Sequence, residues 1–85
     1  MNKSEQTILA YLSKMNKSDT PIFSTFQIIR ALDLSPTIVY RNIQKFEEEG
    51  IVKRIAFMTR KIVELTKKGV ELALAQEKVD EKYGK

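Results

Sequence analysis

Residues 35–49 contain the polar side chains whose types and spacing say most about chemistry. If this segment is a helix, side chains three and four positions apart lie on the same face. One such face holds Thr37, Tyr40, Arg41, Gln44 and Lys45. These side chains include two cations and no acid, and arginine and glutamine can each make paired hydrogen bonds to a flat partner. The chemistry that they predict is binding to an anionic, hydrogen-bonding surface.

The chain offers few residue types for catalysis or metal binding. It has no histidine, which is the usual general base and metal ligand near neutral pH. It has no cysteine, which excludes disulfides and thiolate metal ligands. Its carboxylates and lysines form no pattern that resembles a catalytic centre. The sequence therefore predicts a protein that is not an enzyme, with no catalytic residue, no metal site and no cofactor.

The net charge of +4 is concentrated in the middle of the chain. Residues 1–34 carry four basic and three acidic side chains, and residues 64–85 carry five of each. Residues 35–63 carry six basic side chains against three acids, which are the consecutive glutamates of residues 47–49. A localised basic surface favours a polyanionic partner more than a diffuse excess would.

Two helices are predicted before the polar segment. Ser4 is a suitable N-cap, and apolar residues follow it at helical spacing, which predicts a helix over residues 4–15. Ser24 and Gln27 have the spacing of a capping box and predict a second helix over residues 24–32.

The third predicted helix, residues 35–49, starts only two residues after the second one ends. Ser35 is a good N-cap, Pro36 suits the first helical position, and Gly50 suits the left-handed position after the helix end. So short a turn prevents the two helices from lying side by side, and a steeply crossed helix-turn-helix is expected. The buried side of the third helix is predicted to contain Val39, Ile43 and Phe46.

A β-hairpin is predicted after the third helix. Two β-branched runs, residues 51–56 and 61–65, flank a tip at residues 57–60. No Asn-Gly or Asp-Gly pair marks the turn, so a loop of four or five residues is expected. The two apolar residues at the tip, Phe57 and Met58, are expected to tuck under the hairpin.

The last helix, residues 66–83 with Thr66 as N-cap, has apolar residues on two sides. One side is expected to contact a partner chain through Leu72, Ala75, Val79 and Tyr83. The other side is expected to close the core of the domain through Val70, Ala73 and Leu74. Two apolar sides favour a homodimer formed through this helix. The alternative is a single broad stripe packed against the first helix.

The segment "LSPTIVYRNIQKFEEEGIVKR", residues 34–54, resembles the recognition helix and wing entry of winged helix-turn-helix DNA-binding domains, of the kind found in MarR- and PadR-like regulators of bacteria and archaea. "VELTKKG", residues 63–69, resembles the strand that leaves the wing and the helix start after it. The resemblance covers about residues 23–69. It implies a mainly α fold with a β-hairpin wing, in the order helix, helix, helix, wing, helix, as a single domain over residues 1–85.

The resemblance also implies which residues face DNA. On the recognition helix they are Ser35, Thr37, Tyr40, Arg41, Gln44 and Lys45. On the wing, residues 51–65, they are Lys53, Arg54, Arg60 and Lys61. Arg41 and Gln44 would contact base edges in the major groove, and the wing cations would contact the backbone or the minor groove. The alternatives are an ordinary solvated helix face and a hairpin whose charges prevent edge-to-edge aggregation.

Together these features predict a homodimeric, sequence-specific regulator that binds double-stranded DNA, most simply as a repressor. The alternatives are an architectural or partition protein that coats DNA with weak sequence preference, and a winged-helix module that binds other proteins. No small-molecule effector is expected, because the long flanking helices of MarR-like proteins are absent. The N-terminus lacks the apolar core of a signal peptide and no apolar run could span a bilayer, which predicts a cytoplasmic, nucleoid-associated protein without membrane contact.

Overall fold

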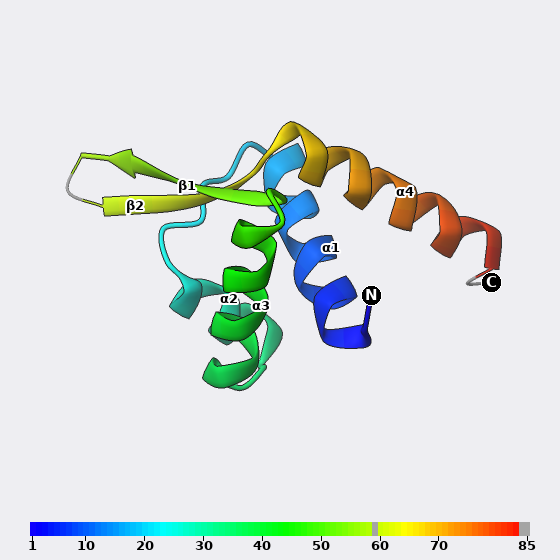
Figure 1. Ribbon diagram of the computed structural model, residues 1–85, viewed down its shortest axis with the longest axis horizontal. Coiled ribbons are helices and arrows are strands. Elements are labelled where there is room, and N and C mark those ends of the chain that lie inside the picture. The colour runs from blue at the N-terminus through cyan, green and yellow to red at the C-terminus, as the bar shows by residue number, and fades with distance from the viewer. Residues whose placement is uncertain (59, 84–85) are drawn as a thin grey trace.

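Four helices and one β-hairpin follow one another in the predicted order (Figure 1). The computed structural model describes residues 1–58 and 60–83, and within these ranges it does not describe the side chains of Phe57, Arg60, Lys61 and residues 78–83. The elements are α1 (Lys3–Lys17), α2 (Thr25–Leu32), α3 (Pro36–Glu48), β1 (Val52–Phe57), β2 (Arg60–Leu65) and α4 (Lys67–Tyr83). This architecture confirms the mainly helical winged-helix fold.

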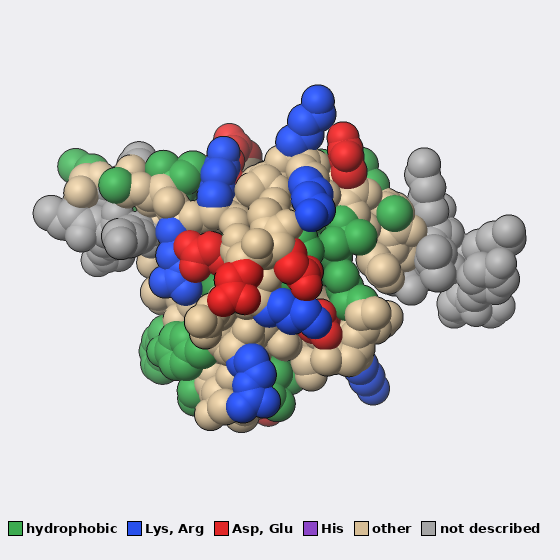
Figure 2. Space-filling view, viewed as in Figure 1, with side chains coloured by type: hydrophobic (Ala, Val, Ile, Leu, Met, Phe, Trp, Pro, Cys, Tyr) green, Lys and Arg blue, Asp and Glu red, His purple; other side chains and the backbone are tan. Residues whose placement is uncertain are grey.

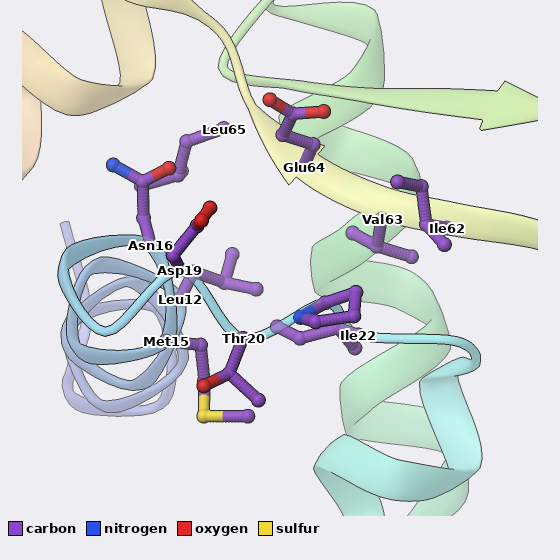
Figure 3. Close-up of a pocket in the computed structure, with 11 residues that line it drawn as sticks. Leu12, Met15, Asn16, Asp19, Thr20, Ile22, Ile62, Val63, Glu64 and Leu65 are labelled. Atoms are coloured by element: carbon purple, nitrogen blue, oxygen red, sulfur yellow. The ribbon is translucent and has the colours of Figure 1, made fainter.

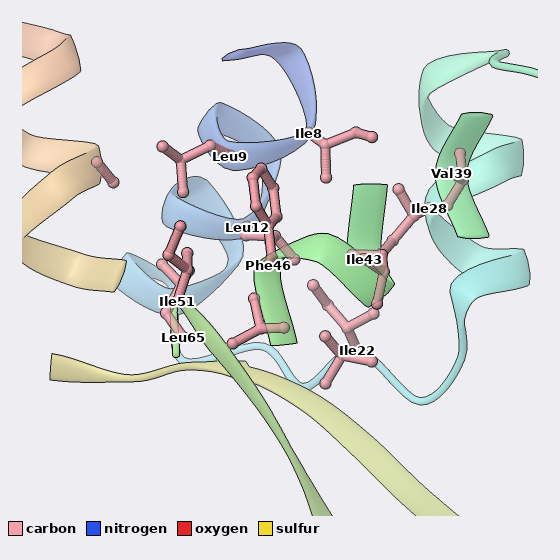
Figure 4. Packing of buried hydrophobic residues seen from close by; sticks show 13 residues of the cluster. Ile8, Leu9, Leu12, Ile22, Ile28, Val39, Ile43, Phe46, Ile51 and Leu65 are labelled. Carbon is pink, nitrogen blue, oxygen red and sulfur yellow. The ribbon is translucent and has the colours of Figure 1, made fainter. Parts of the chain in front are cut away.

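The core forms where α3 packs against α1 and α2. The predicted stripe of α3 is confirmed, since Val39, Ile43 and Phe46 are completely buried. Figure 4 shows Phe46 among side chains of α1 and Val39 beside Ile28 of α2. Burying one side of α3 in this way turns its polar face outward.

The helix starts follow the local capping signals, with one correction at α1. Ser24 and Ser35 cap α2 and α3 as predicted, because each hydroxyl accepts a hydrogen bond from the backbone N–H three residues later. Helix α1 begins earlier than predicted, with Asn2 instead of Ser4 as its N-cap. The side chains of Asn2 and Glu5 each accept a hydrogen bond from the other residue's backbone N–H, at 2.9 and 3.4 Å, which completes a capping box.

The end of α3 is fixed by Gly50. Its φ of 74° is left-handed, as predicted for the residue after a helix. The N–H of Ile51 donates to the carbonyl of Phe46 at 2.8 Å, and the N–H of Gly50 donates to the carbonyl of Glu47 at 3.1 Å. These two bonds form a Schellman motif, which turns the chain directly from α3 into β1.

The hairpin differs from the prediction at its tip. Strands β1 and β2 pair as far as Phe57 and Arg60, so two residues connect them instead of four or five. Met58 is not tucked under the hairpin: its side chain is 92% exposed, because the tip lies beyond the helical body and has no core beneath it (Figure 1). The side chain of Phe57 lies outside the described set.

The hairpin is attached to the domain at its base. The N–H of Val63 donates to the carbonyl of Ile22 at 2.8 Å, which adds a one-residue bridge from the α1–α2 connection to β2. Val52, Val63 and Leu65 are buried at this end. The base of the wing therefore belongs to the core, while its tip projects.

Helix α4 uses a different face for the core than predicted. Ala73 is buried and Val70 is partly buried against the core, as expected, but Leu72 also packs there. Leu74, which was expected in the core, is 42% exposed. The first turn of α4 lies close to Ile51, the residue before β1, because Gly69 has no Cβ atom to meet the Ile51 carbonyl oxygen.

A joint connects the first turn of α4 to the end of α3. The Thr66 hydroxyl donates to the carbonyl oxygens of Gly50 and Ile51 and accepts from the N–H of Gly69, which confirms Thr66 as N-cap. The ammonium of Lys68 donates to the carbonyl of Glu49 at 2.8 Å. A Cβ atom on Gly69 would overlap the carbonyl oxygen of Ile51, so only glycine allows this approach.

We expect Gly69→Ala to lower the free energy of unfolding by about 2–3 kcal/mol, because the added methyl group overpacks against backbone. Gly50→Ala is the matched control. A Cβ at Gly50 meets no atom within 4 Å, so only the left-handed backbone opposes it, by about 1 kcal/mol. Urea unfolding measures both values. If Gly69→Ala loses no more unfolding free energy than Gly50→Ala, the close approach of Gly69 to the Ile51 carbonyl oxygen is contradicted.

Candidate nucleic-acid interface

The N-terminal half of α3 presents a strip of exposed polar side chains. We call it the α3 strip, and it consists of Thr37, Tyr40, Arg41 and Gln44, all exposed. Tyr40 is 51% exposed although it is large and partly apolar. Ser35 lies at the N-terminal end of the strip, where its side-chain oxygen accepts from the N–H of Ile38 at 3.2 Å. Four of the six residues predicted on this helix thus form one surface, with Ser35 at its edge.

Lys45 lies at the edge of the α3 strip, one helical turn after Arg41, and its side chain is 51% exposed. Its ammonium donates to the carboxylate of Glu5 on α1 at 3.2 Å, and the Glu5 side chain is only 7% exposed. The local sequence does not predict this ion pair, because Glu5 is 40 positions away from Lys45 in the chain. In the structure its charge balances a buried carboxylate between α1 and α3.

The environment of Glu5 favours its charged form. Burial by itself raises the pKa of the Glu5 carboxyl group, but hydrogen bonds from Lys45 and from the N–H of Asn2 lower it by more. The positive charges of Lys45 and the chain's N-terminal amino group act in the same direction, so the pKa lies below its ordinary value of 4.5.

The four predicted wing cations do not form one cluster. Successive residues of a strand point to opposite faces, so Lys53 and Arg54 are separated. Arg54 lies on the same face as the buried Val52 and Val63, and its Nε is 3.7 Å from a carboxylate oxygen of Glu47. Lys53 lies on the other face, opposite Glu64 in the strand register. The side chains of Arg60 and Lys61 fall outside the described set, so their prediction is untested.

The charges of α3 are sorted along its length. The α3 strip holds Arg41 and no acid, whereas Glu47, Glu48 and Glu49 are all exposed at the C-terminal end. On the face of the molecule drawn in Figure 2, acidic side chains lie in the middle, and lysine and arginine side chains lie around them. A polyanion would therefore be attracted to the N-terminal half of α3 and repelled from its C-terminal end.

A hollow of about 250 Å³ lies between the C-terminal end of α1 and β2 (Figure 3). Its floor is apolar and contains Leu12, Met15, Ile22, Val63 and Leu65. Its polar lining residues are Asn16, Asp19, Thr20 and Glu64. No residue of the α3 strip lines it, so the hollow is a separate feature of the surface.

In the part of the chain that the structure describes, no three acidic, histidine or cysteine side chains come together as a metal site would require. Over the same residues, no helix combines the length and the apolar character needed to cross a bilayer.

We expect Glu5→Gln to destabilise the protein most at neutral pH. The folded pKa of Glu5 is below the unfolded value near 4.5, so ionised Glu5 stabilises the fold above pH 4.5, and this contribution is lost as the pH falls from 4.5 through the folded pKa. The difference between wild type and variant, measured by urea unfolding, should shrink from pH 7 to pH 3. Glu48→Gln, at an exposed position of α3, is the control. If the difference in unfolding free energy between wild type and Glu5→Gln stays constant with pH, the fold does not favour the ionised form of Glu5.

No protein-family model matches the chain, and no curated protein matches it. Solved structures are similar over nearly its whole length. AF1382 from Archaeoglobus fulgidus has a TM-score of 0.83 and 21% identity, and the match covers 95% of this chain and 88% of AF1382. MepR, a transcription regulator of the Staphylococcus aureus multidrug efflux pump MepA, has a TM-score of 0.83 and 19% identity, with 96% of this chain and 59% of MepR covered.

ZitR from Lactococcus lactis is also similar, with a TM-score of 0.78, 21% identity, and coverage of 96% of this chain and 54% of ZitR. This chain thus spans little more than half of MepR and ZitR. MepR in a complex with DNA matches as well, with a TM-score of 0.77 at 19% identity. The recognised resemblance is therefore confirmed at the level of the fold, and the chain folds as a winged helix-turn-helix domain.

Proposed function

We propose that this protein is a sequence-specific regulator of transcription that binds double-stranded DNA as a homodimer and acts as a repressor on nucleoid DNA. One observation carries the proposal. The N-terminal half of α3, the second helix of a helix-turn-helix, presents Tyr40, Arg41 and Gln44 to solvent while its other side is completely buried. The similarity in fold to MepR, which has been solved in a complex with DNA, supports it.

The geometry of α3 fits the major groove. An α-helix fills that groove, and recognition helices enter it with their N-terminal residues. Asp33, in the left-handed conformation with φ of 53°, ends α2 and allows α3 to start three residues later. The acidic end of α3 then points away from the phosphates. In this placement Arg41 pairs with guanine, Gln44 pairs with adenine, and Thr37 and Tyr40 contact phosphate or a thymine methyl group.

Intramolecular pairing leaves fewer free cations than the sequence contains. Lys45 is paired with Glu5, and Arg54 lies near Glu47. Phosphate contacts beside the α3 strip then depend on Lys53 and on the two wing residues whose side chains are not described, Arg60 and Lys61. One copy of the domain would hold DNA weakly, and two copies on a palindromic site would double the contacts.

Helix α4 is the proposed dimer element. Leu74 and Ala75 are exposed on the side of α4 that the core does not use. The C-terminal half of the helix extends beyond α1 (Figure 1). Glu77 accepts hydrogen bonds from Ser13 at 3.1 Å and from Lys17 at 2.6 Å, which fixes the middle of α4 on α1. The proposed interface keeps Ala75, Val79 and Tyr83 from the sequence prediction, which recur every four residues on one face of α4, and leaves out Leu72, which packs against the core.

The joint at Thr66 and Gly69 would set the spacing between half-sites. It attaches α4 to the C-terminal end of α3 through hydrogen bonds from the Thr66 and Lys68 side chains to backbone carbonyl oxygens. A dimer formed through α4 would therefore hold its two recognition helices at one separation, as a palindrome with fixed half-site spacing requires.

Arg41→Ala tests the recognition role. In vitro selection from random duplexes with the wild-type protein should yield a palindromic site. Affinity of Arg41→Ala for that site should fall by about 1–3 kcal/mol, with relaxed preference at one base pair, because a bidentate contact is lost. Lys14→Ala removes an exposed cation of α1 and is the charge-matched control, with little expected change.

Other results of the same selection would support the alternatives. Bound duplexes without a common site would favour a DNA-coating protein. The absence of any duplex binding at 150 mM salt would favour a protein-interaction module. Equal losses of affinity for Arg41→Ala and Lys14→Ala would mean that Arg41 contributes only its positive charge and does not recognise a base.

Ala75→Glu tests the dimer. Wild type should sediment at twice the chain mass of 9.8 kDa at micromolar concentration, and the variant should sediment at 9.8 kDa, because a carboxylate would be buried without a partner. Glu71→Gln, at an exposed position one helical turn earlier, should leave the mass unchanged. A wild-type mass of 9.8 kDa would defeat the homodimer.

A further inference from the structure

Met58 is the most exposed large apolar side chain among the described residues. It is 92% exposed, whereas the next, Phe26, is 59% exposed and has the guanidinium of Arg30 5.9 Å from its ring centroid. Met58 follows Phe57, the last residue of β1, at the tip of a hairpin that projects from the helical body (Figure 1). Solvation of this side chain is unfavourable, and packing within the chain does not offset it.

The backbone of Met58 is also unfavourable. Its φ of 56° is left-handed, a conformation that costs a residue with a Cβ atom free energy and that asparagine and glycine tolerate. Two-residue hairpin connections require such angles, which is why Asn-Gly and Asp-Gly are common there. A methionine at this position thus has both a strained backbone and an exposed apolar side chain. The two-residue turn explains the left-handed backbone, but nothing in the described part of the chain covers the apolar side chain, which points to a contact made outside the chain.

The charge of the hairpin identifies the partner as a polyanion. Residues 52–63 contain Lys53, Arg54, Arg60 and Lys61 and no acid. A tip of two residues is narrow, and the minor groove of DNA is about 6 Å wide. Methionine is one of the apolar residues that minor-groove proteins insert between base pairs.

We propose that Met58 is an apolar wedge that enters the minor groove, partly unstacks one base step and bends the DNA. The inference rests on the proposed DNA-binding function and adds a residue and a mode of recognition to it. The methionine side chain leaves water for the stacked bases, and the basic composition of the hairpin attracts the phosphates beside the groove.

The wedge would read sequence without hydrogen bonds to bases. The hairpin projects well beyond α3, on the side of the body opposite to the end of α4 (Figure 1). Its tip would therefore reach DNA that flanks the base pairs under α3. Pyrimidine–purine steps such as TA and CA unstack most readily. We therefore expect the protein to prefer these steps in the outer flanks of its DNA site.

Met58→Asn and Met58→Leu separate the wedge from the turn. Asparagine relieves the left-handed strain and removes the apolar side chain, so the variant should gain about 2–5 °C in Tm. Its affinity for the selected duplex should fall about tenfold, and energy transfer between dyes at the two DNA ends should show a smaller bend. Leucine keeps the strain and the apolar side chain, so Tm, affinity and bend should stay near wild type.

Selection repeated with Met58→Asn should keep the central palindrome and lose the flanking TA or CA preference. Wild-type affinity and bend in Met58→Asn would overturn the wedge, and so would equal losses in both variants. Either result is compatible with the proposed function if Arg41→Ala still relaxes the base preference within the palindrome. If wild type binds no duplex, both the function and the wedge fail.

Discussion

The close contact between Gly69 and the carbonyl of Ile51 determines where the projecting parts of this molecule point. Because α4 starts this close to β1, the Thr66 hydroxyl reaches two carbonyl oxygens and Lys68 reaches a third. The end of α3, the start of the hairpin and the start of α4 therefore meet at one joint. From it the hairpin and α4 leave in opposite directions (Figure 1). Hydrogen bonds from the Thr66 and Lys68 side chains to backbone carbonyl oxygens hold the start of α4 at the end of α3.

Charge plays a smaller part at the candidate interface than the composition indicates. Lys45 pairs with Glu5 and Arg54 lies near Glu47, so an acid partly offsets the charge of each of these exposed cations. Arg41 remains as the cation of the α3 strip, beside tyrosine, glutamine and threonine. A protein that coats DNA through counterion release needs many free cations. A surface with one arginine among hydrogen-bonding side chains is better suited to base edges, and this favours the sequence-specific regulator over the DNA-coating alternative.

Local sequence signals predicted most of the fold. The caps at Ser24, Ser35 and Thr66 and the turn at Gly50 act over three or four residues, so they can be read without knowing the rest of the structure. The stripe of α3 needs only helical periodicity. The partner of Lys45 could not be predicted, because it comes from packing α1 on α3. The rotation of α4, which buries Leu72 and exposes Leu74, accompanies a contact between Gly69 and Ile51, 18 residues earlier.

The predictions for Lys45 and Leu72 differ in kind from the one for Met58. Lys45 and Leu72 depart from the local pattern, and each gains a partner inside the chain, an ion pair in one case and apolar burial in the other. Met58 departs from the turn pattern and stays exposed. Sites where local rules fail are expected to be strained or functional. A departure with an internal partner is explained by the fold, whereas one without such a partner is explained by a contact outside it. On this ground we group the hairpin tip with the proposed binding surface of the protein and not with its scaffold.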